Sequence, residues 1–140
     1  MKRETLNEGV FMKYKVCGEL LGFAQTREVE ITEIDELFFT MKDIKNEYIS
    51  FTLVNPYLLR EYSFDLPSDV EVLLDIQSDS ELIIYNLLVV QKPLEKSVIN
   101  FLAPIVINKT NKKLAQLVLD PLKYPDFGFA QTIVSFKNKI

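Results

Sequence analysis

The stretch INFLAPIVIN, Ile99 to Asn108, decides which class of fold this chain adopts. It is apolar enough for a strand, yet it carries Asn100 near its start and Pro104 at its centre. Proline has no amide hydrogen to give to a β-ladder, so we expect the segment to lie at a sheet edge or to bend at a bulge. Period-two alternation then sorts the side chains into two sets. One face, expected to lie in a core, holds Ile99, Phe101, Ala103, Ile105 and Ile107, and the other, which is mixed, holds Asn100, Leu102, Pro104, Val106 and Asn108.

The rest of the chain supplies further strand candidates. Alternating patterns and short apolar runs rich in aromatic and β-branched residues favour strands at residues 11–17, 27–32, 37–44, 48–55 and 82–91. The last of these is apolar almost throughout, so it should be covered on both faces, and Asn86 within it needs an internal hydrogen-bond partner. After residue 108, the polar turn KTNK and the run LAQLVLD predict a hairpin whose turn spans Asn108 to Lys112.

One helix is predicted between these β segments. Ser68 is a suitable N-cap residue, and Glu71 three positions later completes a capping box. Val70, Leu73 and Leu74 then supply an apolar stripe on one side of the helix. The helix is expected to be short because QSDSE, residues 77–81, follows it.

These elements together predict a mostly β protein, a single-domain antiparallel β-barrel or sandwich-like fold with one short helix that closes one end. The 140 residues suffice for one domain with a sizeable core. Roughly seven or eight strands follow one another, mostly in hairpin order. We expect residues 1–10 to form a flexible N-terminal extension, residues 11–130 the β domain and residues 131–140 a C-terminal tail.

The composition argues against most enzyme classes. The chain has no histidine and one cysteine, Cys17, so the commonest general base and the commonest zinc ligand are missing and no intrachain disulfide can form. We therefore predict a protein that is not an enzyme, with no catalytic residue, no metal and no cofactor, and we expect Cys17 to be a small buried hydrophobe. The apolar runs are too short to span a bilayer and no secretory signal is visible, so the expected location is the cytoplasm.

Charge is unevenly distributed along the chain. The net charge is −4, but residues 61–91 contain no lysine or arginine and seven acidic residues, Glu61, Asp65, Asp69, Glu71, Asp75, Asp79 and Glu81. Such a segment should repel phosphate backbones and attract basic partners. The sequence therefore predicts a docking face for a basic protein and argues against direct binding of nucleic acid.

Several alternative roles remain open at this point. The pairs Asp65 with Asp69 and Asp75 with Asp79 could bind calcium or act as acid and base, although neither has the glycine-centred spacing of a calcium loop, and a solvated surface is the simpler interpretation. Asn108, like Asn100, could contact a ligand but is better explained as a partner for nearby backbone or as the start of a turn. A small-ligand-binding β-barrel or a carboxylate hydrolase would need a polar cavity that holds paired acids.

A family resemblance appears once several motifs are taken together. INFLAPIVIN followed by LAQLVLD and KYPD, with LLGF near the start and ISFTLVNPYLLREYSFDLP in the middle, is similar to the signature of the FliW family of flagellar assembly factors. The similarity extends roughly from residue 11 to residue 127. Two departures affect local backbone shape: many members have proline where this chain has Leu21, and many have glycine where it has Leu114 and Ala115.

The resemblance implies a non-enzymatic, β-rich protein with two alternative partners, flagellin and the small RNA-binding regulator CsrA. Binding CsrA would relieve its repression of flagellin messenger RNA, and flagellin that has not been secreted would displace CsrA and stop translation. An alternative within the same class is a dedicated flagellin chaperone with no effect on CsrA. No membrane, direct nucleic-acid or small-molecule partner is expected.

The two partners are assigned to two sets of residues. We expect CsrA, which must be basic to bind RNA, to dock on Asp65, Asp69, Glu71, Asp75, Asp79 and Glu81. Flagellin's terminal segments are expected to bind as an amphipathic helix in an apolar groove. We expect that groove on the mixed face of residues 99–108, formed by Asn100, Leu102, Pro104 and Val106.

Overall fold

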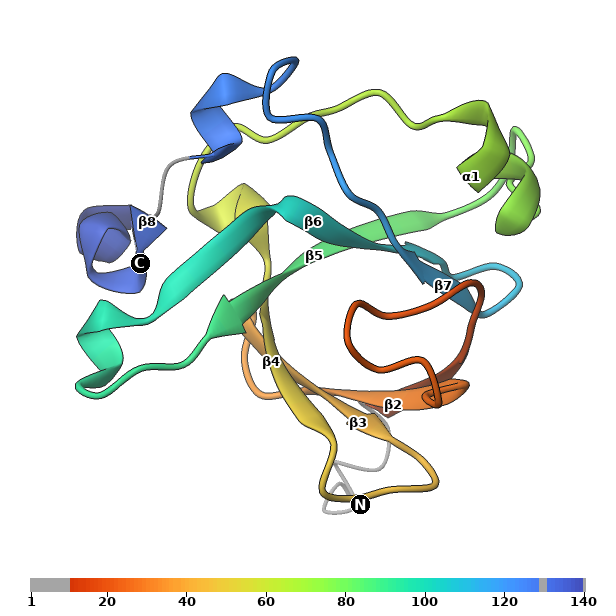
Figure 1. The fold of residues 1–140 in the computed structure, drawn as a ribbon, viewed down its shortest axis with the longest axis horizontal. Coiled ribbons are helices and arrows are strands. Elements are labelled where there is room, and N and C mark those ends of the chain that lie inside the picture. Colours follow the sequence, from red (N-terminus) through yellow and green to blue (C-terminus); the bar gives the residue numbers. More distant parts are fainter. Residues whose placement is uncertain (1–10, 129–130, 140) are drawn as a thin grey trace.

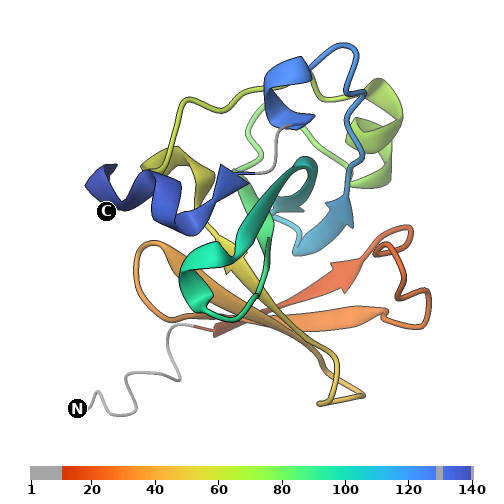
Figure 2. The same cartoon turned by 60° about the vertical axis from the view of Figure 1, so that its left-hand side comes forward.

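The protein folds into a closed β-barrel with an additional layer on one side (Figures 1 and 2). The structure is a computed structural model, and it describes residues 11–128 and 131–139. The strands are β1 (Phe11–Val16), β2 (Glu28–Glu33), β3 (Phe38–Asp43), β4 (Ser50–Val54), β5 (Leu82–Val89), β6 (Val98–Asn108), β7 (Lys113–Gln116) and β8 (Gln131–Thr132). The helices are α1 (Ser68–Leu73) and short 3-10 turns at Pro56–Leu58, Leu94–Lys96, Pro125–Gly128 and Ile133–Lys139.

The barrel consists of β1 to β7 in chain order, and it closes where β7 meets β1. Successive strands pair antiparallel, whereas β1 and β7 pair parallel, Lys15 with Lys113 and Val16 with Leu114. The expected β-barrel is thus confirmed, with one correction to its antiparallel description. In a ring of seven strands that alternate in direction, the first and last run the same way, so the closing pair is necessarily parallel.

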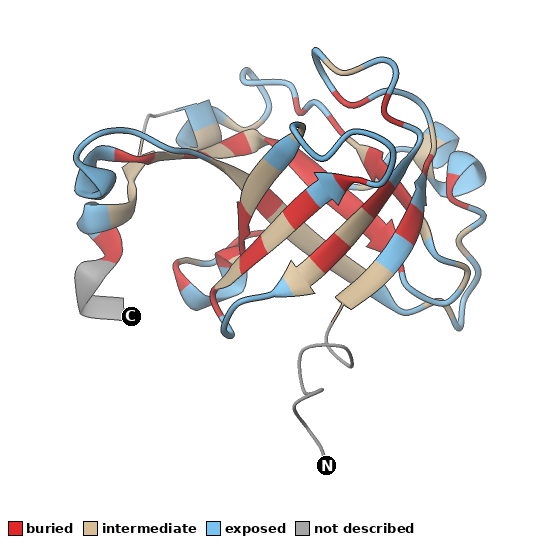
Figure 3. Cartoon of the chain, turned by 90° about the horizontal axis from the view of Figure 1, so that it is seen from below, coloured by how far each residue is buried: buried red, intermediate tan, exposed pale blue. Residues whose placement is uncertain are grey.

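The barrel interior is filled by side chains that alternate with exposed ones along the strands (Figure 3). This inner cluster includes Tyr14, Val16, Val29, Ile31, Phe39, Met41, Leu53, Ile105, Ile107 and Leu114. Met41, Leu53 and Ile105 have no exposed surface. Burial of large apolar side chains contributes about 1.5–3 kcal/mol each to folding, so this cluster is a main source of stability.

Strand β6 does not lie at a sheet edge but bends at a bulge formed by Phe101 to Pro104, which is the second of the two arrangements expected from the central proline. Asn100 pairs with Leu87 and Ile105 pairs with Tyr85, so five steps along β6 oppose two steps along β5. Within the bulge Pro104 pairs with no residue of β5, and its missing amide hydrogen therefore costs no ladder hydrogen bond.

The bulge also overturns the expected alternation of β6. Side chains alternate between the two faces of a strand, and β6 advances five residues where β5 advances two. Because the difference is odd, the residues of β6 after the bulge point to the opposite face of the sheet from the one that simple alternation predicts. Ile105 and Ile107 lie inside the barrel, whereas Ile99 and Phe101 belong to a different cluster outside it with Val54. All five residues of the expected core face are buried, but Ile99 and Phe101 belong to one core and Ile105 and Ile107 to another.

Asn86, Tyr62 and Asn100 are among the polar side chains that hold the bulge. Asn86, fully buried on β5, donates from Nδ2 to the Asn100 carbonyl at 3.0 Å and to the Tyr62 hydroxyl at 3.0 Å. The Tyr62 hydroxyl in turn donates to the Phe101 carbonyl. Asn100 Oδ1 accepts from the Leu102 amide at 3.1 Å. The amide nitrogen of Asn86 therefore has the internal partners that were expected, whereas its buried Oδ1 accepts no hydrogen bond from a described residue.

An outer layer, formed by residues 55–81 and 117–128, covers the outer face of β5, β6 and β7 (Figure 2). Leu74, directly after α1, is fully buried against Val106 and Ala115, whose neighbours Ile105 and Leu114 face the barrel interior. The helix thus lies against the barrel wall, and the expectation that it closes one end is wrong. The wall is apolar on both faces where this layer covers it.

The C-terminal residues also belong to this assembly. β8 pairs with β6 through Val98 and Thr132, and Phe136 is buried in the same cluster as Phe101. Arg60 lies over the Phe101 and Phe127 rings, at 5.2 and 5.0 Å from their centroids, and donates to Gln131 Oε1 at 2.7 Å. Residues 131–139, expected to form a tail, thus pack on the barrel, whereas the expected extension at residues 1–10 lies outside the described residues.

Replacing Tyr62 with phenylalanine tests the hydrogen bonds at the bulge. Tyr62→Phe keeps the ring but leaves the buried Phe101 carbonyl without its donor, so we expect a loss of about 1–3 kcal/mol in the free energy of unfolding. Urea denaturation measures it. Tyr48→Phe, at a side chain that is 90% exposed, is the control and should change stability by less than about 0.5 kcal/mol. Equal stability of the two variants would contradict this account of the bulge.

Asp43, at the end of β3, should make stability depend on acid pH. Its carboxylate is buried, which disfavours the charge, but it accepts hydrogen bonds from the Thr26 hydroxyl and the Lys45 amide, both at 2.8 Å. These bonds outweigh the burial and hold the pKa of Asp43 below its ordinary value of 3.8. The resulting stabilisation is present above pH 3.8 and is lost as the pH falls through the lower pKa of the folded state.

We therefore expect Asp43→Asn to be less stable than the parent at pH 7, by about 1–3 kcal/mol, and to lose less stability on acidification. Urea denaturation at pH 7 and at about pH 3 measures both effects. A variant that loses stability with acid as steeply as the parent would exclude Asp43 as a source of this pH dependence.

Candidate functional site

The acidic residues predicted to bind a partner lie on one segment of the outer layer, on α1 and the loops that flank it. We call Asp65, Asp69, Glu71, Asp75, Asp79 and Glu81 the acidic face. All six residues are exposed, as a docking surface requires. Figure 1 places α1 at the rim of the molecule, away from the β3–β4 hairpin.

Two bases from later in the chain reduce the charge at the ends of the acidic face. Lys123 Nζ lies 3.0 Å from Asp65 Oδ2, and this contact raises the pKa of the lysine. Lys109 Nζ lies 3.7 Å from Glu81 Oε2. The other four acids have no ion pair with any residue that the structure describes, so the unbalanced negative charge is concentrated on α1 and the loop after it.

The ends of α1 differ from the predicted capping. Pro67 is the N-cap residue, so Ser68 is the first helical residue, and the expected capping box with Glu71 is absent from this helix. At the other end, Asp75 has a positive φ of 51°, and the Ile76 amide donates to the Glu71 carbonyl at 2.9 Å. This is a Schellman ending, in which the left-handed residue is usually glycine or asparagine.

Two asparagines of the β6–β7 hairpin hold the segment that carries the acidic face. Asn108, fully buried, donates from Nδ2 to the carbonyls of Leu74 at 3.0 Å and Asp75 at 3.3 Å. Asn111 Nδ2 also donates to the Leu74 carbonyl, at 3.0 Å. Asn108 thus satisfies neighbouring backbone, as the simpler of its two interpretations predicts. The acidic face is therefore presented on a segment tied to the barrel wall.

An exposed apolar side chain lies among the acids. Val72 is 80% exposed, and with Glu71, Asp75, Ser68, Ile76 and Gln77 it lines a shallow groove beside α1. Val72 was not one of the residues predicted from the sequence to bind a partner. Its position could have been derived, because Leu74 is buried and a residue two positions away points to the opposite side of a helix. The acidic face thus offers an apolar contact surrounded by carboxylates.

The predicted flagellin groove is not an open surface. Pro104 and Val106 are buried, Val106 completely, whereas Asn100 and Leu102 keep part of their surface exposed. The side-chain oxygen of Asn100 is already used by the Leu102 amide within the bulge. The expected accessibility is therefore wrong for Pro104 and Val106, because the outer layer folds back over this face of β6. The contact of Asn100 and Leu102 with flagellin stays a prediction.

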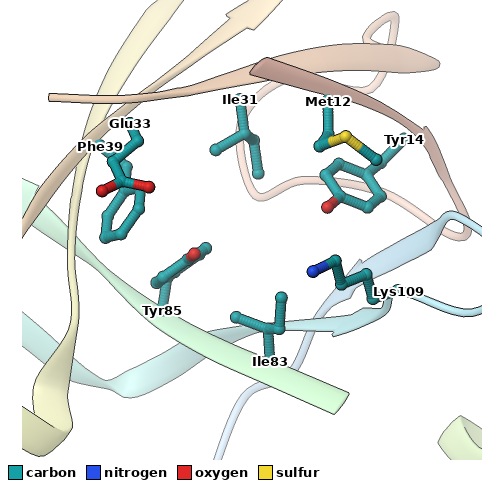
Figure 4. A pocket seen from close by; sticks show the side chains of 8 residues that line it. All are labelled: Met12, Tyr14, Ile31, Glu33, Phe39, Ile83, Tyr85 and Lys109. Carbon is teal, nitrogen blue, oxygen red and sulfur yellow. The ribbon is translucent and has the colours of Figure 1, made fainter. Parts of the chain in front are cut away.

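A cavity of about 240 Å³ lies at one end of the barrel interior (Figure 4). It is lined by Met12, Tyr14, Ile31, Glu33, Phe39, Ile83, Tyr85 and Lys109. Burial, with smaller effects from Tyr14 and Glu33, raises the pKa of Tyr85 to about 12, so its hydroxyl is uncharged at neutral pH. Glu33 is the single carboxylate in the lining, so this cavity does not contain the paired acids that a carboxylate hydrolase needs.

Three further features bear on possible functions: the single cysteine, clusters of metal-ligating residues and helices long enough to cross a membrane. Cys17 is half-buried, rather than fully buried as expected, and packs at the edge of the outer-layer core. Within residues 11–128 and 131–139, no cluster of three or more potential metal ligands occurs. In the same ranges, no helix has the length and apolar character needed to cross a membrane.

Fold and surface together describe a small, closed, mixed β-barrel with an exposed acidic segment on a covering layer. Comparison with known proteins defines the class further: the family model described as FliW protein matches residues 7–132. The chain therefore belongs to the FliW family of flagellar assembly factors. This confirms the family expected from the sequence motifs.

Individual relatives agree with this assignment. Flagellar assembly factor FliW 2 of Wolinella succinogenes is 42% identical over 127 residues, which cover 91% of this chain and 93% of the relative. Flagellar assembly factor FliW of Sulfurimonas denitrificans is 41% identical over 128 residues, 91% of this chain and 100% of the relative. A crystal structure of the flagellar assembly factor FliW has the same fold, with a TM-score of 0.73, 21% identity and coverage of 86% of this chain and 82% of that chain.

Replacing Asn108 tests whether the hairpin holds the acidic face. In Asn108→Ala the Leu74 and Asp75 carbonyls lose a buried donor, so we expect amide hydrogens of residues 68–81 to exchange with solvent about tenfold faster or more. Hydrogen exchange followed by mass spectrometry measures this. Asn46→Ala, in the exposed β3–β4 turn, is the control. Unchanged exchange in residues 68–81 of the Asn108 variant would contradict the proposed anchoring.

Proposed function

We propose that this flagellar assembly factor acts in the cytoplasm as a partner switch that binds CsrA or flagellin. While CsrA is bound, its repression of flagellin messenger RNA is relieved. When unsecreted flagellin accumulates, it occupies the assembly factor, CsrA is released and translation of flagellin stops. This mechanism needs binding surfaces and no catalytic group.

One observation carries the CsrA half of the proposal. Four exposed carboxylates have no ion pair to described residues, Asp69, Glu71, Asp75 and Asp79, and two of them, Glu71 and Asp75, line a groove with the exposed Val72. A basic protein surface would gain complementary charge at this place, and Val72 would supply an apolar contact that can be desolvated. Charge pairs of this kind mainly raise the association rate and the selectivity for a basic partner.

The local structure determines which acids are suitable for a test. Asp75 is the left-handed residue of the Schellman ending, so a lysine there would strain the backbone as well as reverse the charge. Neither Glu71 nor Asp79 has a positive φ, and the side chains of both are exposed, so a lysine at these positions changes the charge without straining the backbone. We therefore choose Glu71→Lys with Asp79→Lys. Glu36→Lys with Glu47→Lys is the matched control, since both acids are exposed outside the acidic face and the change in net charge is the same.

We expect calorimetric titration with purified CsrA to give micromolar or tighter binding that weakens between about 0.05 and 0.5 M salt and disappears after saturation with flagellin. The Glu71 and Asp79 double variant should bind CsrA about tenfold more weakly at low salt, and the control pair should bind like the parent. Equal affinities of both double variants would exclude the acidic face as the docking site.

Two other results would contradict the proposal as a whole. If flagellin binds but addition of CsrA produces no heat, the protein is a dedicated flagellin chaperone with no effect on CsrA. Simultaneous binding of both partners, with no loss of CsrA affinity on saturation with flagellin, would exclude the switch.

A further inference from the structure

The cavity at the end of the barrel contains a polar group that the protein itself leaves unused. Tyr14 is only 4% exposed, and its hydroxyl points into the cavity (Figure 4). No hydrogen bond joins this hydroxyl to another described residue. Burial, together with the charge of Glu81, raises the pKa of Tyr14, so the hydroxyl is neutral and can both donate and accept. The oxygen itself is not cut off from solvent, so it is accessible through the cavity to a ligand as well as to water.

Glu33 and Lys109 are the two charged residues of the cavity lining, and the Lys109 ammonium points toward the cavity (Figure 4). Lys109 already pairs with Glu81 at 3.7 Å. Glu33, exposed at the rim, has no ion pair with a described residue. It lies beside the rings of Phe39 and Tyr85, whose centroids are 4.3 Å apart (Figure 4). A carboxylate next to aromatic faces attracts organic cations by charge and by cation–π interaction.

Size and lining set the class of ligand. The walls include the apolar side chains of Ile31 and Ile83, which suit a ring or a short alkyl chain. The volume of about 240 Å³ lies below the roughly 300–1,000 Å³ of pockets for drug-sized ligands. The occupant should therefore be small, with an apolar body and one charged head group.

We propose that this cavity binds a small organic cation, an amidinium, guanidinium or ammonium group on an aromatic or short aliphatic body. The head group contacts Glu33 and the tyrosine hydroxyls, and the body lies against Ile31 and Ile83. The site is distinct from α1, because its lining comes from the inner surface of the barrel and from its rim, whereas α1 lies on the outer face. Glu81, at one end of the acidic face, is near the cavity through its contact with Lys109. The proposed site gives the barrel interior a binding role in addition to the exchange of CsrA and flagellin.

Benzamidine is a suitable probe, and titration of the full chain followed by amide and methyl NMR is the experiment. We expect shift changes centred on the residues that line the cavity and a dissociation constant of about 1 mM or lower. Benzyl alcohol, which is neutral, and benzoate, which is anionic, have similar bodies and should bind at least about tenfold more weakly. Shifts centred on the acidic face, or equal binding of benzoate, would overturn the proposal.

Variants localise the effect to the named groups. Glu33→Gln should weaken benzamidine binding about tenfold, whereas Glu30→Gln, at an outward-facing position of the same strand, should bind it like the parent. Tyr14→Phe keeps the buried ring and removes only the hydroxyl, so it should fold normally and also bind more weakly. Parent-like binding by the Glu33 variant would overturn the cation site even if the cavity itself takes up the ring.

Discussion

The hydrogen bonds that Asn86 and Tyr62 make to the backbone of β6 are the contacts on which the rest of the fold depends. They hold the bulge at Phe101 to Pro104, and the bulge lets one strand face the barrel interior at Ile105 and the outer cluster at Ile99. Without this change of face, one half of the strand would present apolar side chains to water. The outer layer that carries the acidic face packs on the surface created in this way.

Much of the fold could be predicted because short patterns in the sequence indicate its local features. Pro104 indicated a bulge, Asn86 in an apolar strand indicated an internal partner, and the polar turn after Asn108 indicated the hairpin. What could not be predicted was the length of the bulge. A bulge that is one residue longer or shorter would reverse which side chains of β6 face the barrel interior. The alternation of apolar residues does not contain the length of the bulge. The burial of Val106 was missed for a related reason, since Leu74 covers it from a distant part of the chain.

The candidate sites divide in the same way. The run of acids was visible in the composition, and exposure of its members followed from their charge. The two lysines that neutralise its ends were not visible, because Lys123 and Asp65 are 58 residues apart. The barrel-end cavity was even less accessible to sequence reasoning. Its lining comes from β1, β2, β3, β5 and the β6–β7 turn, and only the closed ring brings these together.

The parallel pairing of β1 with β7 has a consequence for the order in which the chain can fold during synthesis. Lys15 on β1 pairs with Lys113 on β7, which is synthesised last of the barrel strands. The ring therefore cannot close until nearly the whole barrel has left the ribosome. Until then β1 has a free edge with unpaired backbone groups, which is a site where strands of different molecules can associate. Lys13 and Lys15 are exposed on this strand, and their charges would discourage such association while the chain is incomplete.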